Sequence, residues 1–308
     1  MSKQKTIALG AAVCALMAGG LVSQVWGQMN AWMSSSNHNR MIEIQEQGGA
    51  RESTGKVEIA YFSNSAFRVT SPRGITLLVD PWRNDPSGAW GLWYRVEFPM
   101  TAVDIGLSTH AHFDHDALDR LDAHMLLDRM AGTFTLGDLK IMGIADKHVC
   151  RAEGTVRWTE AVKQFGGQEP CPPNNLRHLD NTMYLIETGG MRLLMWGDNR
   201  PDPPQRIWDQ IRDVDVVFLP VDSSGHILTH ARADEVAERL GAKVIIPHHY
   251  LVPETTFFTS TLEPALDYTT SHKSHDLTDS ATIELGPDDI ADKTMHVIYF
   301  GSNNMVKM

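Results

Sequence analysis

The chain has 308 residues, of which 42% are hydrophobic and 21% are charged, and its formal net charge at pH 7 is −11. This composition excludes an intrinsically disordered chain and is that of a globular protein with a sizeable core. The acidic balance argues against nucleic acid as a partner, because nucleic-acid-binding proteins need clustered positive charge. The length suits one large domain or two small ones.

Residues 1–27 have the features of a Sec-type signal peptide. Lys3 and Lys5 precede an apolar run over residues 7–22, and small residues follow near residue 27. The run is shorter than the roughly 20 residues of a stable membrane span, which favours cleavage. The alternative is an uncleaved anchor, which would then be the expected link to a membrane. We therefore expect a periplasmic or secreted protein. Cleavage removes two lysines and no acidic residue, which changes the net charge from −11 to −13.

Residues 28–56 are rich in Ser, Asn, Gln, Gly and Glu and show no sustained hydrophobic periodicity. This composition is typical of a flexible tether, so the folded domain is expected to span residues 57–308.

Two cysteines, Cys150 and Cys171, remain after residue 27. An even pair in an oxidising compartment favours a disulfide. Thiolate metal ligands are the weaker alternative, because neither cysteine has another at a short metal-binding spacing.

The folded part begins with short β-prone runs, and its second half alternates strands with helices, which indicates an α/β fold. In the first half, we expect strands at 57–62, 66–70, 75–79 and 104–108, the start of a helix at 116–121, and hairpins over 133–144 and 183–196. In the second half, we expect helices at 203–212 and 231–240, buried strands at 214–220 and 243–247, and a closing strand at 295–300.

Residues 110–115 read His-Ala-His-Phe-Asp-His and follow the expected strand 104–108. Imidazole and carboxylate groups are ligands for zinc, iron and manganese. Alternation along an extended stretch points His110 and His112 the same way, so Asp114 and His115 can face a second ion. The hexad therefore predicts a metal site.

Further candidate ligands come at later strand ends, where a rigid sheet can hold them in fixed positions. They are His148 and Asp198 after the two hairpins, and His248 or His249 after the buried strand 243–247. Asp198 could bridge two ions, and His178 is a rival to His148.

Over residues 57–300, the sequence resembles the metallo-β-lactamase superfamily. The resemblance lies in the hexad, a distant His, a Gly-Asp after a hairpin and a late His. Residues 247–250 and 148–151 are similar to segments of the branch that contains L-ascorbate 6-phosphate lactonase and N-acyl phosphatidylethanolamine phospholipase D. The resemblance implies a four-layer αββα sandwich, and it favours His148 and His249 over their rivals. The ligands that we expect are therefore His110, His112, Asp114, His115, His148, Asp198 and His249.

Other residues near these strand ends have two interpretations each. Asp80 either accepts an N–H from a metal-binding histidine, as the resemblance implies, or starts an Asp-Pro turn. Three residues could line a pocket, or could be ordinary structural residues: His226, His230 and Tyr250. Four aromatic residues could form an apolar rim for substrate, or could pack over the sheet edge: Trp82, Trp90, Trp93 and Tyr94.

The function that we expect is hydrolysis of a lactone, amide or phosphodiester bond in a small or lipid-like molecule. Two divalent ions would lower the pKa of a shared water toward about 7. Asp114 and Asp198, as catalytic residues, would orient that water. Zinc is the expected metal, with manganese or iron as alternatives. One competing hypothesis is a di-iron redox protein, which metal analysis with absorption spectra would distinguish. The other is a non-catalytic metal-binding module, which would bind two ions but hydrolyse nothing in a broad substrate panel.

Overall fold

The computed structural model describes residues 40–88, 90–149, 180–257 and 261–306. The expected signal peptide, residues 28–39 of the expected tether, the two cysteines and His178 lie outside these ranges. The chain divides into residues 1–41 and 42–308, and the architecture described below is that of the second unit. Among the described residues, no helix is long and apolar enough to cross a membrane.

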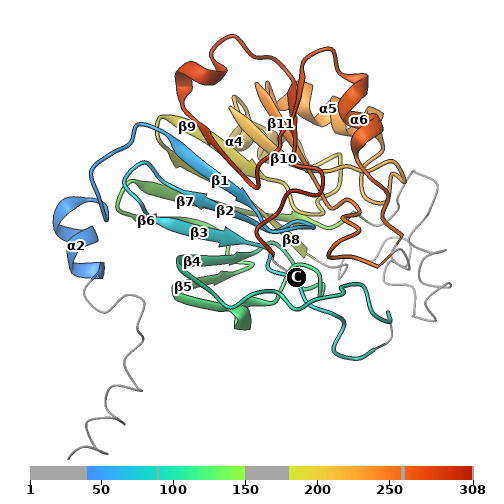
Figure 1. Cartoon of the computed structure of the whole chain (residues 1–308). Helices are drawn as coiled ribbons and strands as arrows, with labels where there is room; N and C mark the ends of the chain where they lie inside the picture. Colours follow the sequence, from blue (N-terminus) through green and yellow to red (C-terminus); the bar gives the residue numbers. More distant parts are fainter. Residues whose placement is uncertain (1–39, 89, 150–179, 258–260, 307–308) are drawn as a thin grey trace, which may run out of the picture. The chain divides into compact units, whose positions relative to one another are not determined.

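A six-stranded mixed sheet carries the first part of the domain (Figure 1). In this sheet β3 and β4 are parallel neighbours, so Asp80 and the hexad follow adjacent strand ends. The strands, in spatial order, are β13 (Thr282–Leu285), β1 (Val57–Tyr61), β2 (Phe67–Thr70), β3 (Thr76–Val79), β4 (Thr101–Ser108) and β5 (Leu121–Asp128).

An eight-stranded mixed sheet carries the later candidates. β7 and β9 are each antiparallel to β8, so they run in the same direction. Since β10 and β11 are parallel to β9, all four of these strands end at one common edge. The strands, in spatial order, are β12 (His275–Leu277), β14 (His296–Tyr299), β11 (Val244–His248), β10 (Val216–Pro220), β9 (Met191–Met195), β8 (Asp180–Thr188), β7 (Leu139–Lys147) and β6 (Gly132–Leu136).

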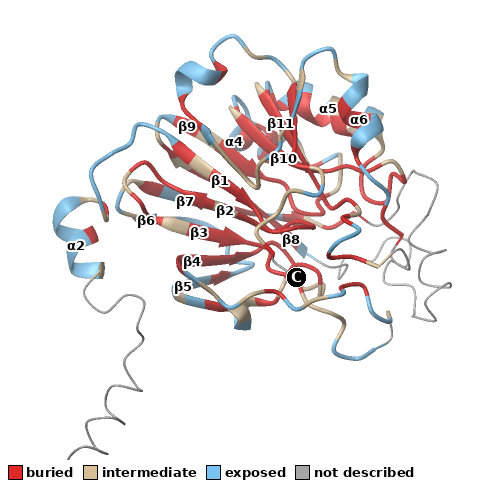
Figure 2. Ribbon diagram, viewed as in Figure 1, coloured by how far each residue is buried: buried red, intermediate tan, exposed pale blue. Residues whose placement is uncertain are grey.

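The core lies between the two sheets, and buried strands of both line it (Figure 2). Side-chain alternation divides each strand between two layers. In β1, Ile59 and Tyr61 face the core between the sheets, whereas Ala60 faces an aromatic cluster on the other side of the sheet. In β10, Phe218 belongs to the core between the sheets and Val217 to the core beneath the helices.

Helices contribute the core on the outer side of the eight-stranded sheet. The longest, α5 (His230–Leu240), begins at Thr229, whose hydroxyl accepts the amide of Arg232, and ends at Gly241 in the left-handed conformation (φ 67°). Two shorter helices are α4 (Gln205–Ile211) and α6 (Leu266–Ser271). Two mixed sheets with helices outside confirm the predicted α/β sandwich.

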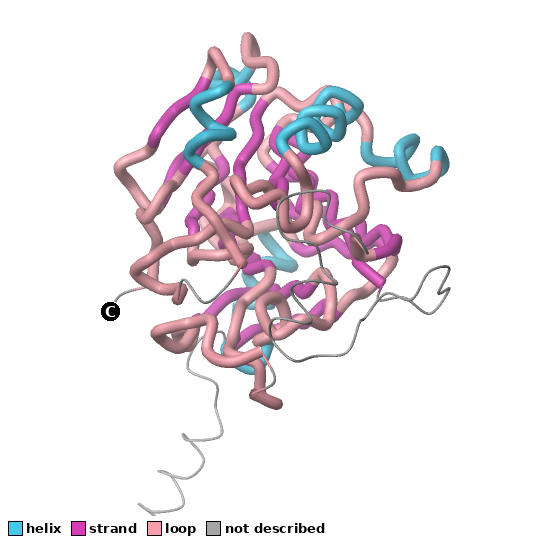
Figure 3. The backbone as a smooth tube through the Cα atoms, turned by 90° about the vertical axis from the view of Figure 1, so that its right-hand side faces the viewer, coloured by secondary structure: helices cyan, strands magenta, loops and turns pink. Residues whose placement is uncertain are grey.

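Loops and turns make up much of the face turned to the viewer in Figure 3.

Three local expectations differ from the structure. The helix expected at 116–121 is a single 3₁₀ turn at Leu118–Arg120. The chain then continues into the edge strand β5, in which exposed residues alternate with less exposed ones. Within the expected tether, Arg40–Gln47 forms helix α2, and Ile44 is buried in the core between the sheets. The short elements α6, β12 and β13 were not predicted at all.

Candidate metal centre

The hexad forms a tight loop directly after β4. The amide of His115 donates to the carbonyl of His112 at 2.9 Å, which closes the loop on itself. Asn64, from the turn between β1 and β2, donates its side-chain amide to the carbonyl of Asp114 at 3.1 Å. His110 and His115 are fully buried, and Asp114 is 4% exposed. The loop therefore holds its polar side chains inside the protein.

A first cluster gathers His110 and His112 with two residues of the other sheet. The candidate ligand atoms of His110, His112, His148 and Asp198 all lie within 4.8 Å of one another. The His148 Nε2 atom is 3.4 Å from Asp198 Oδ2, and His110 Nε2 is 3.9 Å from the same oxygen. We define these four residues as the first cluster.

A second cluster gathers Asp114, His115 and His249, again with candidate ligand atoms within 4.8 Å. The His249 Nε2 atom is 3.1 Å from Asp114 Oδ2, and His115 Nε2 is 3.5 Å from it. The strand end of β11 thus meets the hexad across the sandwich, as the sequence predicted for His249.

Asp198 connects the two clusters. Its Oδ1 atom lies 3.6 Å from His115 Nε2, and its Oδ2 atom lies 3.5 Å from His249 Nε2. The preceding Gly197 has φ 59°, and a Cβ atom there would lie 2.6 Å from the Asn181 side-chain oxygen. Glycine therefore lets the chain turn sharply enough to place Asp198 between both groups.

Buried polar atoms at the centre fit a metal site. Within the described ranges, neither His115 Nε2 nor Asp198 Oδ1 has a hydrogen-bond partner, although both are inaccessible to solvent. An unmade hydrogen bond at such a position costs about 1 to 3 kcal/mol, so each atom calls for a partner of another kind. A set of imidazole and carboxylate donors suits zinc, iron or manganese.

Electrostatics favours the ligand forms of the first cluster. Burial, reinforced by the nearby His148, lowers the pKa of His112 to about 3. Burial and the neighbouring imidazoles also lower the pKa of His110 well below its usual value. Burial alone would raise the pKa of Asp198, but His249 and His115 hold it well below its usual range. Neutral imidazoles thus face an ionised carboxylate.

Asp80 supports both clusters from behind. Its Oδ2 atom lies 2.8 Å from His115 Nδ1, so a proton on Nδ1 leaves Nε2 directed at the second cluster. Asp80 also accepts the amide and the hydroxyl of Thr109, both at 2.8 Å, and that hydroxyl oxygen is 3.0 Å from His110 Nδ1. The predicted contact between Asp80 and a candidate ligand is therefore present.

Backbone strain accompanies these contacts. Asp80 and His249 both have left-handed backbone conformations, with φ of 51° and 59°. Such a conformation costs a non-glycine residue roughly 1 to 3 kcal/mol and is concentrated at functional sites.

The neighbours of His249 take other roles. His248 points to Ser65, with 3.0 Å between Nδ1 and Oγ, and takes no part in either cluster. Tyr250 is a core residue whose hydroxyl donates to the carbonyl of Gly301 at 3.0 Å, so of its two interpretations the structural one is present.

Of the two other histidines suggested for a pocket, one lies beside the centre. The His226 ring stacks on the His249 ring at 5.5 Å, and its Nδ1 atom is 2.8 Å from the Thr261 hydroxyl. The His230 ring instead contacts Tyr268 at 5.2 Å, on the outer helices.

The expected aromatic rim is a packed layer. Trp82 is fully buried and stacks on Tyr94 with ring centres 4.1 Å apart, and Trp93 is 4% exposed. Trp90 packs against the core beneath the helices. Trp82, Trp93 and Tyr94 cover the six-stranded sheet, so for these three the alternative of packing over the sheet is the one present.

Three residues that support the centre were not among the sequence candidates: Asn64, Thr109 and Asn181. Asn64 and its neighbour Ser63 both have positive φ, as asparagine in a turn tolerates, but a Ser-Asn-Ser turn alone does not reveal a contact with Asp114.

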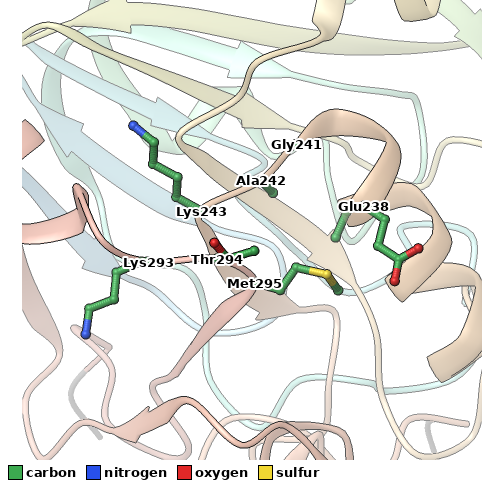
Figure 4. Close-up of a pocket in the computed structure, with 8 residues that line it drawn as sticks. Glu238, Gly241, Ala242, Lys243, Lys293, Thr294 and Met295 are labelled. Atoms are coloured by element: carbon green, nitrogen blue, oxygen red, sulfur yellow. The ribbon is translucent and has the colours of Figure 1, made fainter.

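A surface depression lies elsewhere, beside the end of α5, where Gly241 and Met295 line it (Figure 4). Lys243, which precedes β11, contributes to it, whereas His249 follows the other end of that strand. The depression is therefore separated from the two clusters by the length of β11.

Comparison with known proteins supports a common origin for this arrangement. A model of the β-lactamase superfamily domain matches residues 58–249. A UPF0173 metal-dependent hydrolase from Thermodesulfovibrio yellowstonii is 25% identical to this chain, and the match covers 64% of this chain and 80% of the relative. Another, from Myxococcus xanthus, is 27% identical, and the match covers 65% of this chain and 73% of the relative. A solved Thermotoga maritima structure, named as a Zn-dependent hydrolase of the metallo-β-lactamase superfamily, has 20% identity and a TM-score of 0.55, covering 79% of this chain and 98% of its own.

The two-sheet sandwich and the paired His/Asp clusters, together with these relatives, define a metal-dependent hydrolase. Because the family model spans more than half of the chain, the chain belongs to the metallo-β-lactamase superfamily. The superfamily predicted from the hexad is thereby confirmed, while its branch within the superfamily stays a prediction.

Proposed function

We propose that this protein is an exported hydrolase that holds two divalent metal ions, one in each cluster. The observation that carries the proposal is the position of Asp198, whose two carboxylate oxygens lie 3.4 to 3.6 Å from histidine nitrogens of both clusters. A carboxylate between two clusters is the arrangement by which proteins bring two cations close together. Zinc is the metal that we propose, because the ligand set suits it and the Thermotoga relative is named for it.

Bound ions would supply two chemical effects, an acidified water and a polarised carbonyl or phosphoryl oxygen. The chain itself orients the reactants. Asp114 and Asp198 would accept hydrogen bonds from the attacking water and fix its direction. Asp80 holds the His115 ring in the tautomer that directs Nε2 inward. No serine or cysteine nucleophile takes part.

The substrate that we propose is a small or lipid-like molecule with a lactone, amide or phosphodiester bond. Export rests on the N-terminal sequence alone, in which Lys3 and Lys5 precede an apolar run. N-terminal sequencing of the protein recovered from a bacterial periplasm tests it, and a mature chain that still begins at residue 1 would refute cleavage.

Metal quantification combined with a substrate panel tests the site and the reaction together. Purified wild type should contain two ions per chain and hydrolyse at least one of a chromogenic phosphodiester, a lactone and an amide. Asp114→Ala and His249→Ala should each lose an ion and most of the activity. His248→Ala is the matched control, because that neighbour contacts Ser65 and should keep both ions.

Two results would overturn the proposal. If His248→Ala loses an ion while His249→Ala keeps both, the last ligand is misassigned. If wild type holds two ions and hydrolyses nothing in the panel, the protein is not the proposed hydrolase; iron with visible absorption bands would then favour the redox alternative.

A further inference from the structure

His249 differs from other candidate ligands in what lies behind its ring. Its Nε2 atom lies in the second cluster, but its buried Nδ1 atom has no hydrogen-bond partner among the described residues. For His115, by contrast, Asp80 lies 2.8 Å from Nδ1. For His148, the carbonyl of Val149 lies 2.6 Å from Nδ1. A metal-bound histidine almost always donates its second N–H to such an acceptor, which fixes the ring, so His249 needs support of another kind.

Two imidazole rings lie nearly parallel to the His249 ring. The centre of the His226 ring is 5.5 Å from it, with 14° between the ring planes, and the centre of the His115 ring is 5.4 Å from it, with 18°. Aromatic rings favour offset-stacked contacts with centres about 4.5 to 7 Å apart. His115 is itself a candidate ligand of the second cluster, whereas His226 is buried beside the cluster without being a member of it.

His226 is itself held by two segments of the chain. Its ring Nδ1 atom is 2.8 Å from the Thr261 hydroxyl, and its amide donates to the Ser224 hydroxyl at 3.1 Å. The buried Asp222 carboxylate accepts that Ser224 hydroxyl at 2.8 Å and the amide of Glu263 at 2.8 Å. The turn that carries His226 is therefore tied to the segment that carries Thr261. A ring fixed at both backbone and side chain can set the orientation of a ring stacked against it.

We propose that His226 is a positioning residue, which keeps the His249 ring oriented for metal binding by stacking instead of by a hydrogen bond to Nδ1. The inference rests on the proposed function, because it assumes that an ion occupies the second cluster. Without the flat ring of His226, the His249 side chain can turn about its bonds, so the second cluster loses affinity. The first cluster does not include His249 and keeps its affinity.

His226→Leu and His226→Phe test the proposal, because both fill the space of the imidazole but only Phe keeps a flat ring. Competition with a chelator, on the metal-free full chain, measures the affinity for each zinc ion. His226→Leu should weaken the binding of one ion about tenfold, the lower end of what a supporting partner of a metal ligand contributes. His226→Phe should stay within about threefold of wild type, since ring stacking is kept.

Two further measurements separate positioning from a general effect on folding. In the His249→Ala chain, which has no ring to position, adding His226→Leu should leave the affinity of the remaining ion unchanged. With cobalt in place of zinc, the absorption bands should shift in His226→Leu and return in His226→Phe, because they report how the ligands are arranged around the ion. His230→Leu is the matched control: its ring also contacts an aromatic ring, that of Tyr268 at 5.2 Å, but on the outer helices. It should alter neither affinity nor spectrum.

The outcomes distinguish this inference from the proposed function. If His226→Leu keeps wild-type zinc affinity, or if Leu and Phe weaken it equally, stacking does not position His249 and the proposed hydrolase still stands. A loss of equal size in the His249→Ala chain would show that His226 acts elsewhere. If His226→Leu alone weakens one ion but wild type hydrolyses no substrate, the proposed function fails and the role of His226 stands. If zinc does not bind the second cluster of wild type, both are overturned.

Discussion

The two clusters differ in how they balance charge, although the same hexad supplies part of each. In the first, imidazole rings lie together, with His110 and His112 each 4.7 Å from the ring of His148. In the second, His115 and His249 face carboxylates at 3.1 to 3.6 Å. The first cluster thus combines three imidazoles, of which His110 and His112 are neutral, with one carboxylate, whereas the second pairs two imidazoles with carboxylates even before a metal binds.

The supports behind the clusters differ in the same way. In the second, Asp80 contacts His115 directly. In the first, neutral groups orient the rings, because His148 Nδ1 lies 2.6 Å from the carbonyl of Val149 and Thr109 contacts His110. The first cluster therefore contains imidazoles that are already neutral, whereas the second must release protons when a cation binds.

Asp198→Asn should have the largest effect, because Asp198 is shared by both clusters. The amide keeps the shape of the side chain but loses the charge that faces four histidine nitrogens. We expect kcat/KM to fall on the order of 1000-fold, at the upper end for one electrostatic group. Asp146→Asn is the control, since Asp146 binds Arg200 in a nearby turn, and it should stay within tenfold of wild type.

His110→Ala and His249→Ala should separate the clusters. Each variant should lose one ion and keep the other, because the remaining ligands of the intact cluster stay within 4.8 Å of one another. Elemental analysis gives the count, and cobalt substitution should yield two different absorption spectra, since the retained sites differ in nitrogen number. Loss of both ions in both variants would show that the clusters are a single cooperative unit.

Asp80→Asn and Thr109→Val should distinguish the two supports. Asp80→Asn removes the charge behind His115, so metal affinity at the second cluster should fall about 10 to 100-fold. Thr109→Val removes only the hydroxyl that contacts Asp80 and His110, so the first cluster alone should weaken, and by less. Competition with a chelator measures both. A Thr109→Val effect confined to the second cluster would contradict the assignment of supports.

Much of this centre was readable from the sequence because its side chains follow strand ends directly. The hexad after β4 and Asp198 after β9 come together as predicted, whereas the choice of His249 over His248 after β11 came from the superfamily resemblance. Ligands close to strand ends inherit their positions from the sheet, so local sequence carries the information.

The parts that failed depend on long-range packing. From the sequence, Trp82 and Tyr94 fit a substrate rim and a packed layer equally well. Their burial on the six-stranded sheet shows that they form the packed layer. The edge strand β5 was missed, although its exposed residues alternate as in a strand, because the short stretch at 116–121 resembled the start of a helix; pairing with β4 is what holds the segment in the sheet.

The pH dependence of metal binding should give the smallest effect and the most direct test of the comparison. Burial would lower the pKa of His115, but Asp198 and Asp114 raise it well above its usual value, so at pH 7 the metal-free second cluster carries a proton that a cation must displace. His112, with a pKa of about 3, is already neutral. Between pH 7 and pH 6, affinity should therefore fall about tenfold per displaced proton at the second cluster and by less at the first, where His110 and His112 are already neutral. Calorimetry of zinc binding to His110→Ala, which retains the second cluster, and His249→Ala, which retains the first, measures the two slopes. Equal slopes would mean that ion pairing with Asp114 and Asp198 does not set the charge of the second cluster.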